Sequence, residues 1–164
     1  MSVPIPPALS AAPEDTLEDR AHTTYQADFG SACTVVQFQT RDVIVDRSPH
    51  IANPAREHSY WHTVTSGTPE ITRTKPEARR LRRMPWVKPI IACWAGSKVW
   101  WEYRESSIHW NIWHTGQRHV VIVKQLAGGL YLLKTGYPTD FDVTVWHRRY
   151  QEAKKTGRTL ADAP

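Results

Sequence analysis

Four strand-like segments follow one another in the second half of the chain, and they limit the possible folds more than any other feature. They cover residues 98–104, 108–114, 118–125 and 130–137. The first two alternate apolar and polar side chains, as strands do, and the third is almost continuous valine and isoleucine, which is typical of a central strand. Gly128 and Gly129 indicate a hairpin turn between the last two segments. The pattern therefore predicts an antiparallel sheet of about four strands.

Helical patterns flank this block. Pro76 suits a first helical turn and Pro85 ends a helix, so a helix is expected over residues 76–84, with a second short one beginning near Lys88 or Pro89. Residues 140–156 predict a C-terminal helix, whereas residues 58–67 fit a strand or a helix equally well. The predicted fold class is α+β, with N-terminal helices packed on the antiparallel sheet and a C-terminal helix.

Charge is divided unevenly along the chain. Residues 1–57 carry eight acids and four bases, a net charge of −4, whereas the rest carries 17 bases and eight acids, a net charge of +9. We expect a flexible acidic tail over residues 1–31, one domain over 32–156 and a frayed C-terminus over 157–164. The basic part is typical of nucleic-acid binding, with a solvated basic face as the alternative. The acidic segment is hypothesised to cover the basic site.

Several classes of protein are disfavoured by what the chain lacks. Two cysteines are too few for a disulfide scaffold, and the common nucleotide-binding and hydrolase motifs are missing. His58 and His62 have the i, i+4 spacing of helical metal ligands, but we expect no carboxylate beside them, so neither a metal nor another cofactor is predicted. No apolar run approaches the ~18 residues of a membrane span. The expected location is the cytoplasm, with delivery into a target cell or association with a phage particle as alternatives.

The side chains that remain suit RNA cleavage without a metal. Such cleavage needs a base for the 2′-OH, cations for the phosphate and an acid for the leaving oxygen. A histidine serves either proton role because its ordinary pKa of ~6.5 lies near neutral pH. His62 beside aromatic residues, the arginines of residues 79–83 and the hydroxyls of Thr135 and Tyr137 could supply these parts.

The order of these motifs resembles a known family. Tyr60-Trp61-His62, the run from Arg79 through Pro85-Trp86-Val87-Lys88-Pro89, and Tyr131-Leu132-Leu133-Lys134-Thr135-Gly136-Tyr137 together resemble the phage-associated branch of the barnase–EndoU–colicin–RelE group of ribonucleases. The resemblance covers roughly residues 32–155. It implies a metal-independent endoribonuclease, usually a toxin, that leaves a 2′,3′-cyclic phosphate. It also implies helices packed against a four-stranded antiparallel sheet.

The resemblance also assigns expected roles to residues. His62 is the expected general base or acid, Arg80 and Arg83 are expected to bind the phosphate and the transition state, and Thr135 and Tyr137 are candidates for phosphate contact or proton donation. Further substrate-binding candidates are Arg79, Arg82, Lys88, Lys98, Trp101 and Lys134. The expected partners are RNA, with tRNA and mRNA as candidate substrates, and an antitoxin or immunity protein. The alternatives are a non-catalytic nucleic-acid-binding module and a phage- or virion-associated protein-interaction domain.

Overall fold

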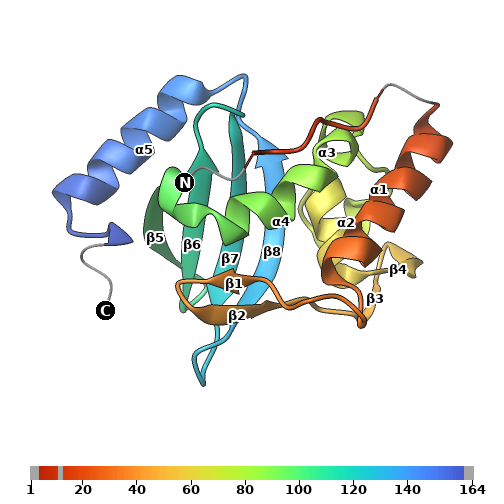
Figure 1. Cartoon of the computed structure of the whole chain (residues 1–164), viewed down its shortest axis with the longest axis horizontal. Helices are drawn as coiled ribbons and strands as arrows, with labels where there is room; N and C mark the ends of the chain where they lie inside the picture. Colours follow the sequence, from red (N-terminus) through yellow and green to blue (C-terminus); the bar gives the residue numbers. More distant parts are fainter. Residues whose placement is uncertain (1–3, 11–12, 161–164) are drawn as a thin grey trace.

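The computed structural model describes residues 4–10 and 13–160. Its centre is a six-stranded sheet with the strand order β1-β2-β8-β7-β6-β5 (Figure 1). Its strands are β1 (Gln37–Phe38), β2 (Arg41–Ile44), β5 (Lys98–Arg104), β6 (Ser107–His114), β7 (His119–Gln125) and β8 (Tyr131–Pro138). A separate two-stranded sheet pairs β3 (Pro49–His50) with β4 (Asn53–Glu57).

Strands β5 to β8 form a meander in which each strand pairs antiparallel with the next. The turn between β5 and β6 consists of Glu105 and Ser106, whose φ angles of 49° and 60° give the two-residue turn that suits twisted hairpins. Gly128 and Gly129 lie between β7 and β8 with φ angles of 82° and 83°, a conformation that glycine adopts without strain. The glycine pair therefore forms the predicted hairpin turn.

The predicted α+β class is confirmed, but the expected sheet of about four antiparallel strands is wrong in size and direction. The β1–β2 hairpin extends the sheet, and β2 runs parallel to β8, with Val43 opposite Tyr131 and Ile44 opposite Leu132. The strand pattern of residues 37–44 is visible in the sequence, yet its partner lies almost 90 residues away. Periodicity identifies a strand but does not identify a distant partner.

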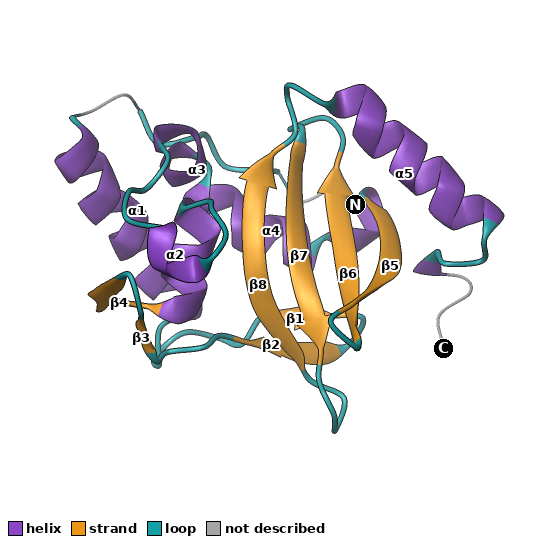
Figure 2. Ribbon diagram, turned by 180° about the vertical axis from the view of Figure 1, so that it is seen from behind, coloured by secondary structure: helices purple, strands orange, loops and turns teal. Residues whose placement is uncertain are grey.

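Helices cover both faces of the sheet. They are α1 (Glu14–Phe29), α2 (His58–Val64), α3 (Ala78–Arg82), α4 (Met84–Ala92) and α5 (Val143–Lys155), with short 3-10 turns η1 (Glu70–Thr72) and η2 (Trp94–Gly96). In Figure 2, α4 crosses behind the strands and α5 lies on the β5 side. The larger apolar core includes Ile90 of α4 and Val121 of β7, and the smaller one joins Trp100 and Trp113 to Trp146 of α5.

Most of the tryptophans belong to these cores. The six that are less than 9% exposed are Trp61, Trp86, Trp100, Trp110, Trp113 and Trp146. The tryptophans are divided between the two cores because side chains alternate along a strand, so that Trp100 and Trp101 of β5 point to opposite faces of the sheet. Trp100 packs with Trp146, whereas Trp101 packs against the larger core. The aromatic side chains therefore stabilise the fold by packing on both faces of the sheet.

The expected flexible tail over residues 1–31 is wrong for much of its length. Residues 14–29 form α1, where Leu17, Ala21, Tyr25 and Phe29 repeat every four residues and are all buried. This spacing gives one apolar helix face, which the acidic composition of the segment obscured. Residues before α1 also pack, since the Leu9 amide donates to the Arg82 carbonyl at 2.8 Å. Residues 1–3 and 11–12 lie outside the described part of the chain.

Two further boundaries differ from expectation. The helix expected over residues 76–84 is the shorter α3, and the helix expected from Lys88 or Pro89 begins at Met84, because Pro85 occupies its first turn instead of ending the previous helix. At the C-terminus, residues 157–160 are not frayed: the Trp101 amide donates to the Arg158 carbonyl at 3.0 Å. Residues 161–164 lie outside the described residues.

The C-terminal helix is confirmed as α5. Within residues 4–10 and 13–160, no helix has the length and apolar character that crossing a bilayer requires.

Candidate functional site

Helix α2 lies along the edge of β8, where it presents the candidate proton-transfer residue. Of residues 58–67, whose sequence fits a strand or a helix, His58–Val64 are helical, and the residues from Ser59 to Val64 are buried. The Ser59 hydroxyl donates to the Leu133 carbonyl of β8 at 3.0 Å and accepts from the Asp46 amide at 2.8 Å. The first bond uses a carbonyl of the β8 edge beyond its short pairing with β2, and the second joins α2 to the segment after β2, so together they hold α2 against the sheet.

Three histidines and one carboxylate gather at this helix. The Nε2 atoms of His62 and His58 lie 2.9 and 3.3 Å from the two carboxylate oxygens of Glu70 in η1. The two rings, which follow each other by one helical turn, stack with centroids 4.7 Å apart. The ring of His50 in β3 lies 5.2 Å from that of His58 and 5.6 Å from that of His62. We call these four residues the histidine cluster.

The histidine cluster corrects one expectation from the sequence. No carboxylate was expected beside His58 and His62, yet Glu70 contacts both. One potential ligand atom from each of the four residues lies within 4.8 Å of the other three. This is the group of side chains at the site that could hold a metal ion.

The surroundings of His62 favour its neutral form. Burial lowers its pKa most, the guanidinium of Arg73 lowers it further, and the hydrogen bond to Glu70 acts in the opposite direction, which leaves the pKa at about 4. A neutral ring that donates through Nε2 to Glu70 keeps its lone pair on Nδ1. His62 is therefore uncharged at neutral pH, with a lone pair on Nδ1 that can act as an acceptor.

Two further predicted residues, Thr135 and Arg80, lie beside His62, and a third, Tyr137, lies under the Arg80 guanidinium. The Thr135 hydroxyl donates to the His62 carbonyl at 3.0 Å, and Nη1 of Arg80 lies 3.5 Å from the same hydroxyl oxygen. The Arg80 guanidinium also lies 5.1 Å from the centre of the Tyr137 ring. Burial raises the pKa of Tyr137, so its hydroxyl keeps its proton. These contacts place a cation and the Thr135 hydroxyl beside the end of α2, whereas the Tyr137 ring packs against Trp146 of α5.

Arg79 and Arg83 are next to this group, but both are engaged elsewhere. Each forms an ion pair with Asp140, at 2.6 and 2.7 Å. Arg83 also donates to the Arg118 carbonyl, and Arg79 stacks over the exposed ring of Phe141. Their guanidinium groups therefore hold α3 against the segment that follows β8, and part of their charge is neutralised there.

Other predicted substrate-binding residues do not gather at His62. Lys98 and Trp101 are on β5, which is separated from β8 by two strands, a distance of about 14 Å at the usual strand spacing. Lys98 contacts His147 of α5, and Lys88 forms a 3.8 Å ion pair with Asp28 of α1. The partly buried Arg82 is on α3, and Lys134 is on β8.

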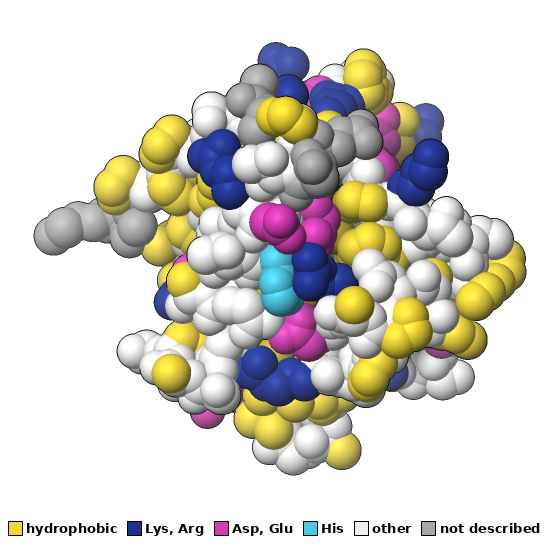
Figure 3. Space-filling view, turned by 90° about the vertical axis from the view of Figure 1, so that its right-hand side faces the viewer, with side chains coloured by type: hydrophobic (Ala, Val, Ile, Leu, Met, Phe, Trp, Pro, Cys, Tyr) yellow, Lys and Arg dark blue, Asp and Glu magenta, His cyan; other side chains and the backbone are white. Residues whose placement is uncertain are grey.

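Glu18, Asp19 and Asp28 of α1 are paired with cations other than the arginines of residues 79–83. Arg56 forms ion pairs with Glu18 at 2.7 Å and Asp19 at 3.3 Å, and Asp28 contacts Lys88. Figure 3 shows the face that carries α1 and β4, where acidic, basic and histidine side chains lie side by side. These contacts do not support the hypothesis that the acidic segment covers the basic site; they hold α1 in place.

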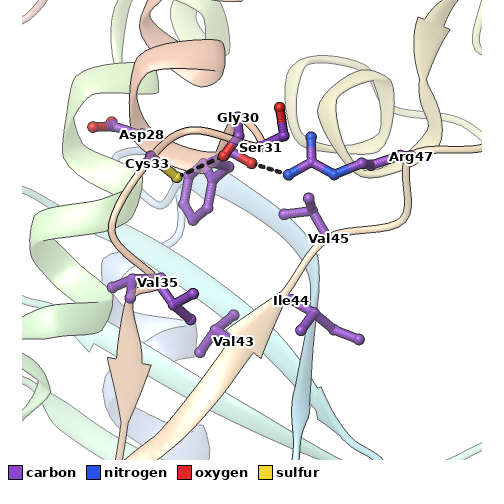
Figure 4. Close-up of a pocket in the computed structure, with 11 residues that line it drawn as sticks. Asp28, Gly30, Ser31, Cys33, Val35, Val43, Ile44, Val45 and Arg47 are labelled. Carbon is purple, nitrogen blue, oxygen red and sulfur yellow. Dashed lines mark hydrogen bonds between the residues drawn. The ribbon is translucent and has the colours of Figure 1, made fainter.

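A pocket of about 210 Å³ lies between the end of α1 and the β1–β2 hairpin (Figure 4). Its wall is largely apolar, with Val35, Val43 and Ile44 below the loop that contains Cys33. The Arg47 side chain closes one side by donating to the Phe29 carbonyl. None of the predicted site residues lines this pocket, so the histidine cluster is a separate feature.

Sequence reasoning missed His50, Glu70 and Arg73 as neighbours of His62. Arg73 donates to the Thr65 carbonyl at 3.0 Å and lies 3.4 Å from the His62 carbonyl, so its cation sits at the C-terminal end of α2. The only signal in the sequence was the i, i+4 pair of His58 and His62. Glu70 and Arg73 lie between residues 58–67 and the helix predicted from residue 76, in a segment without apolar periodicity, and no pattern connects such residues to a particular helix face.

Comparisons with protein-family models, with curated proteins and with solved structures gave no match. The resemblance to the ribonuclease group therefore depends on the sequence motifs alone.

Proposed function

We propose that this protein is a metal-independent endoribonuclease, with His62 as its main proton-transfer residue. The observation that carries the proposal is the arrangement around His62: a carboxylate at 2.9 Å on one side, and Arg73, Arg80 and Thr135 at the end of the same helix. A general base oriented by a carboxylate and placed beside cations is what phosphodiester cleavage by an internal hydroxyl requires.

The reaction would form one bond and break another at the same phosphorus atom. His62 takes the proton of the ribose 2′-OH, the 2′-oxygen attacks phosphorus, and the bond from phosphorus to the 5′-oxygen breaks. A second group returns a proton to the 5′-oxygen, which leaves a 2′,3′-cyclic phosphate and a 5′-hydroxyl. His58 is the second candidate, because its ring stacks on that of His62 and contacts the same carboxylate. Tyr137 is the alternative proton donor.

The phosphate needs positive charge, and the neighbouring residues have an excess of it. Arg73, Arg79, Arg80, Arg82 and Arg83 are five cations, against the three carboxylates of Glu70, Glu77 and Asp140, a net charge of +2. The Arg80 side chain is only 12% exposed and forms a 3.2 Å ion pair with Glu77. A cation held in a fixed position, with little water around it, stabilises a developing phosphorane charge better than a mobile one.

The test compares His62→Gln with the control His147→Gln, which changes an exposed histidine on α5. We expect His62→Gln to lose RNA cleavage and to keep RNA binding, whereas the control keeps both. Binding without cleavage in the native protein would favour the nucleic-acid-binding module instead. A partner complex insensitive to salt, with no RNA bound, would favour the protein-interaction domain, because RNA binding weakens steeply as salt increases. The toxin role, an antitoxin partner and a cytoplasmic location belong to this proposal through the family resemblance.

A further inference from the structure

The histidine cluster has the composition of a transition-metal site. Imidazole nitrogens and a carboxylate oxygen are the ligands that Zn²⁺ and its neighbours prefer, and three of them with one open position are typical of a zinc site that binds water or substrate. The candidate ligand atoms come from three elements, β3, α2 and η1, yet lie within 4.8 Å of one another. Side chains from separate elements converge here on a single point.

The distances between Glu70 and the two histidines are close to those between two ligands of one ion. Two ligands bound at ~2.0–2.1 Å in tetrahedral geometry are about 3.3 Å apart. The contacts of His58 and His62 with the Glu70 carboxylate are 3.3 and 2.9 Å. Both contacts use Nε2, so the two rings present the same nitrogen to the same carboxylate. An ion bound at this point would replace these hydrogen bonds, and the candidate ligand atoms, which lie within 4.8 Å of one another, would close in on it.

His50 supplies an independent sign that a ligand belongs here. Its side chain is fully buried, its Nδ1 accepts the Ala52 amide at 3.0 Å, and its Nε2 has no hydrogen-bond partner among the described residues. Leaving a buried polar atom unpaired costs about 1–3 kcal/mol. Because Nδ1 is an acceptor, the neutral ring carries its proton on Nε2. That N–H is suited to donate to a water or an anion in the open position of the ion rather than to bind the ion itself.

The nitrogen of His58 that does not face Glu70 points toward another carboxylate. The other ring nitrogen of His58, Nδ1, lies 3.7 Å from a carboxylate oxygen of Asp46, and Asp46 is itself held by the amide and hydroxyl of Ser48 at 2.9 and 2.6 Å. Metal-binding histidines generally direct their other nitrogen toward such a carboxylate. The ion pair between Glu70 and the two histidines explains their mutual contacts, but it explains neither the unpaired His50 nor its position against both rings.

We propose that His58, His62 and Glu70 bind one divalent transition-metal ion of the Zn²⁺ class, with His50 donating to the group that fills the open position. If the protein is the ribonuclease proposed above, a bound ion takes the Nε2 lone pair of His62, so that the ring carries its proton on Nδ1 and cannot accept one from the ribose hydroxyl. RNA cleavage would then decrease in proportion to metal loading. This consequence rests on the proposed function, whereas metal binding does not.

The experiment titrates metal-free full-length protein with Zn²⁺ by calorimetry and with Co²⁺ by visible absorption. We expect one ion to bind per chain. The visible absorption bands of bound Co²⁺ should be those of a four- or five-coordinate ion, without the charge-transfer band that a thiolate ligand gives. His58→Gln and Glu70→Gln should lose this binding, and His147→Gln should keep it. Because His50 lies outside the direct ligands, His50→Gln should keep the stoichiometry and weaken affinity by about 10- to 100-fold.

Failure to bind Zn²⁺ or Co²⁺ in the native protein would overturn the proposal, as would binding that both ligand variants retain. His58 and Glu70 are exposed enough to be replaced without unfolding, with side chains 21% and 47% accessible. If a variant nevertheless unfolds, NMR spectra of the native protein test the site instead. Only the ring resonances of the histidine cluster should shift when Zn²⁺ is added, and shifts at the other histidines alone would overturn the proposal. Zinc binding by a protein that cleaves no RNA when it is metal-free would refute the ribonuclease alone, and RNA cleavage by a protein that binds no zinc would refute the metal site alone.

Discussion

Glu102 of β5 is predicted to contribute a large, pH-dependent part of the stability of the α5 side. Its carboxylate, 17% exposed, accepts hydrogen bonds from Trp100 at 3.0 Å and Arg104 at 2.7 Å, and forms a 2.8 Å ion pair with Arg149 of α5. Burial alone would raise the pKa of Glu102, but these hydrogen bonds and charges more than offset it and lower the pKa to about 2.

The magnitude follows from the difference between the folded and unfolded pKa values. The shift from 4.5 to about 2 corresponds to about 3 kcal/mol of stability. Because the pKa is lower in the folded state, this contribution is fully present above the unfolded pKa and is lost as the pH falls through the folded pKa. We expect Glu102→Gln to lower the free energy of unfolding by about 3 kcal/mol at neutral pH and by about 2 kcal/mol near pH 3.5.

Urea denaturation over this pH range measures the difference between the native protein and the variant. Glu152→Gln, on the exposed surface of α5, is the matched control and should change stability by less than about 0.5 kcal/mol. A Glu102→Gln effect that stays constant with pH, or that equals the control, would refute the electrostatic reasoning.

Three further substitutions probe the cores and the support of α2. Ser59→Ala removes the hydroxyl that joins α2 to Leu133, and urea denaturation should show a loss of about 1–3 kcal/mol; a loss near zero would mean that the sheet edge does not need this bond. Trp146→Ala should cost about 3–5 kcal/mol by removing the centre of the smaller core, and a milder effect would show that α5 is loosely packed. Thr135→Val removes the hydrogen bond to His62 and should lower kcat for RNA about fivefold, with Thr135→Ser restoring it; equal rates in the two variants would exclude this bond from catalysis.

Much of the sheet could be predicted because its signals are local. Alternation in β5, the valine-rich run of β7 and the glycine turn before β8 each depend on neighbouring residues. The parallel contact of β2 with β8 depends on residues far apart in the chain, and nothing in either strand specifies it. The packed position of α1 was missed because its four apolar residues are diluted by acids and threonines.

The candidate site likewise has residues that could be predicted from local sequence and residues that could not. His62, Arg80, Thr135 and Tyr137 were predicted from motifs. In the fold Thr135 contacts both His62 and Arg80, and Tyr137 contacts Arg80. Lys98 and Trp101 were predicted beside them, but the meander places β5 two strands away from β8. The carboxylate partner of His62 could not be predicted, because it comes from a three-residue 3-10 turn whose position depends on tertiary contacts.

The central claim is that His62 transfers protons in RNA cleavage without a metal. Purified protein incubated with total RNA in the presence of EDTA tests it most directly, with end-group analysis of the fragments and His62→Gln beside the native protein. The account predicts fragments with 2′,3′-cyclic phosphate and 5′-hydroxyl ends, at a rate that EDTA does not reduce and that His62→Gln abolishes. Intact RNA, cleavage that EDTA eliminates, or undiminished cleavage by His62→Gln would contradict it.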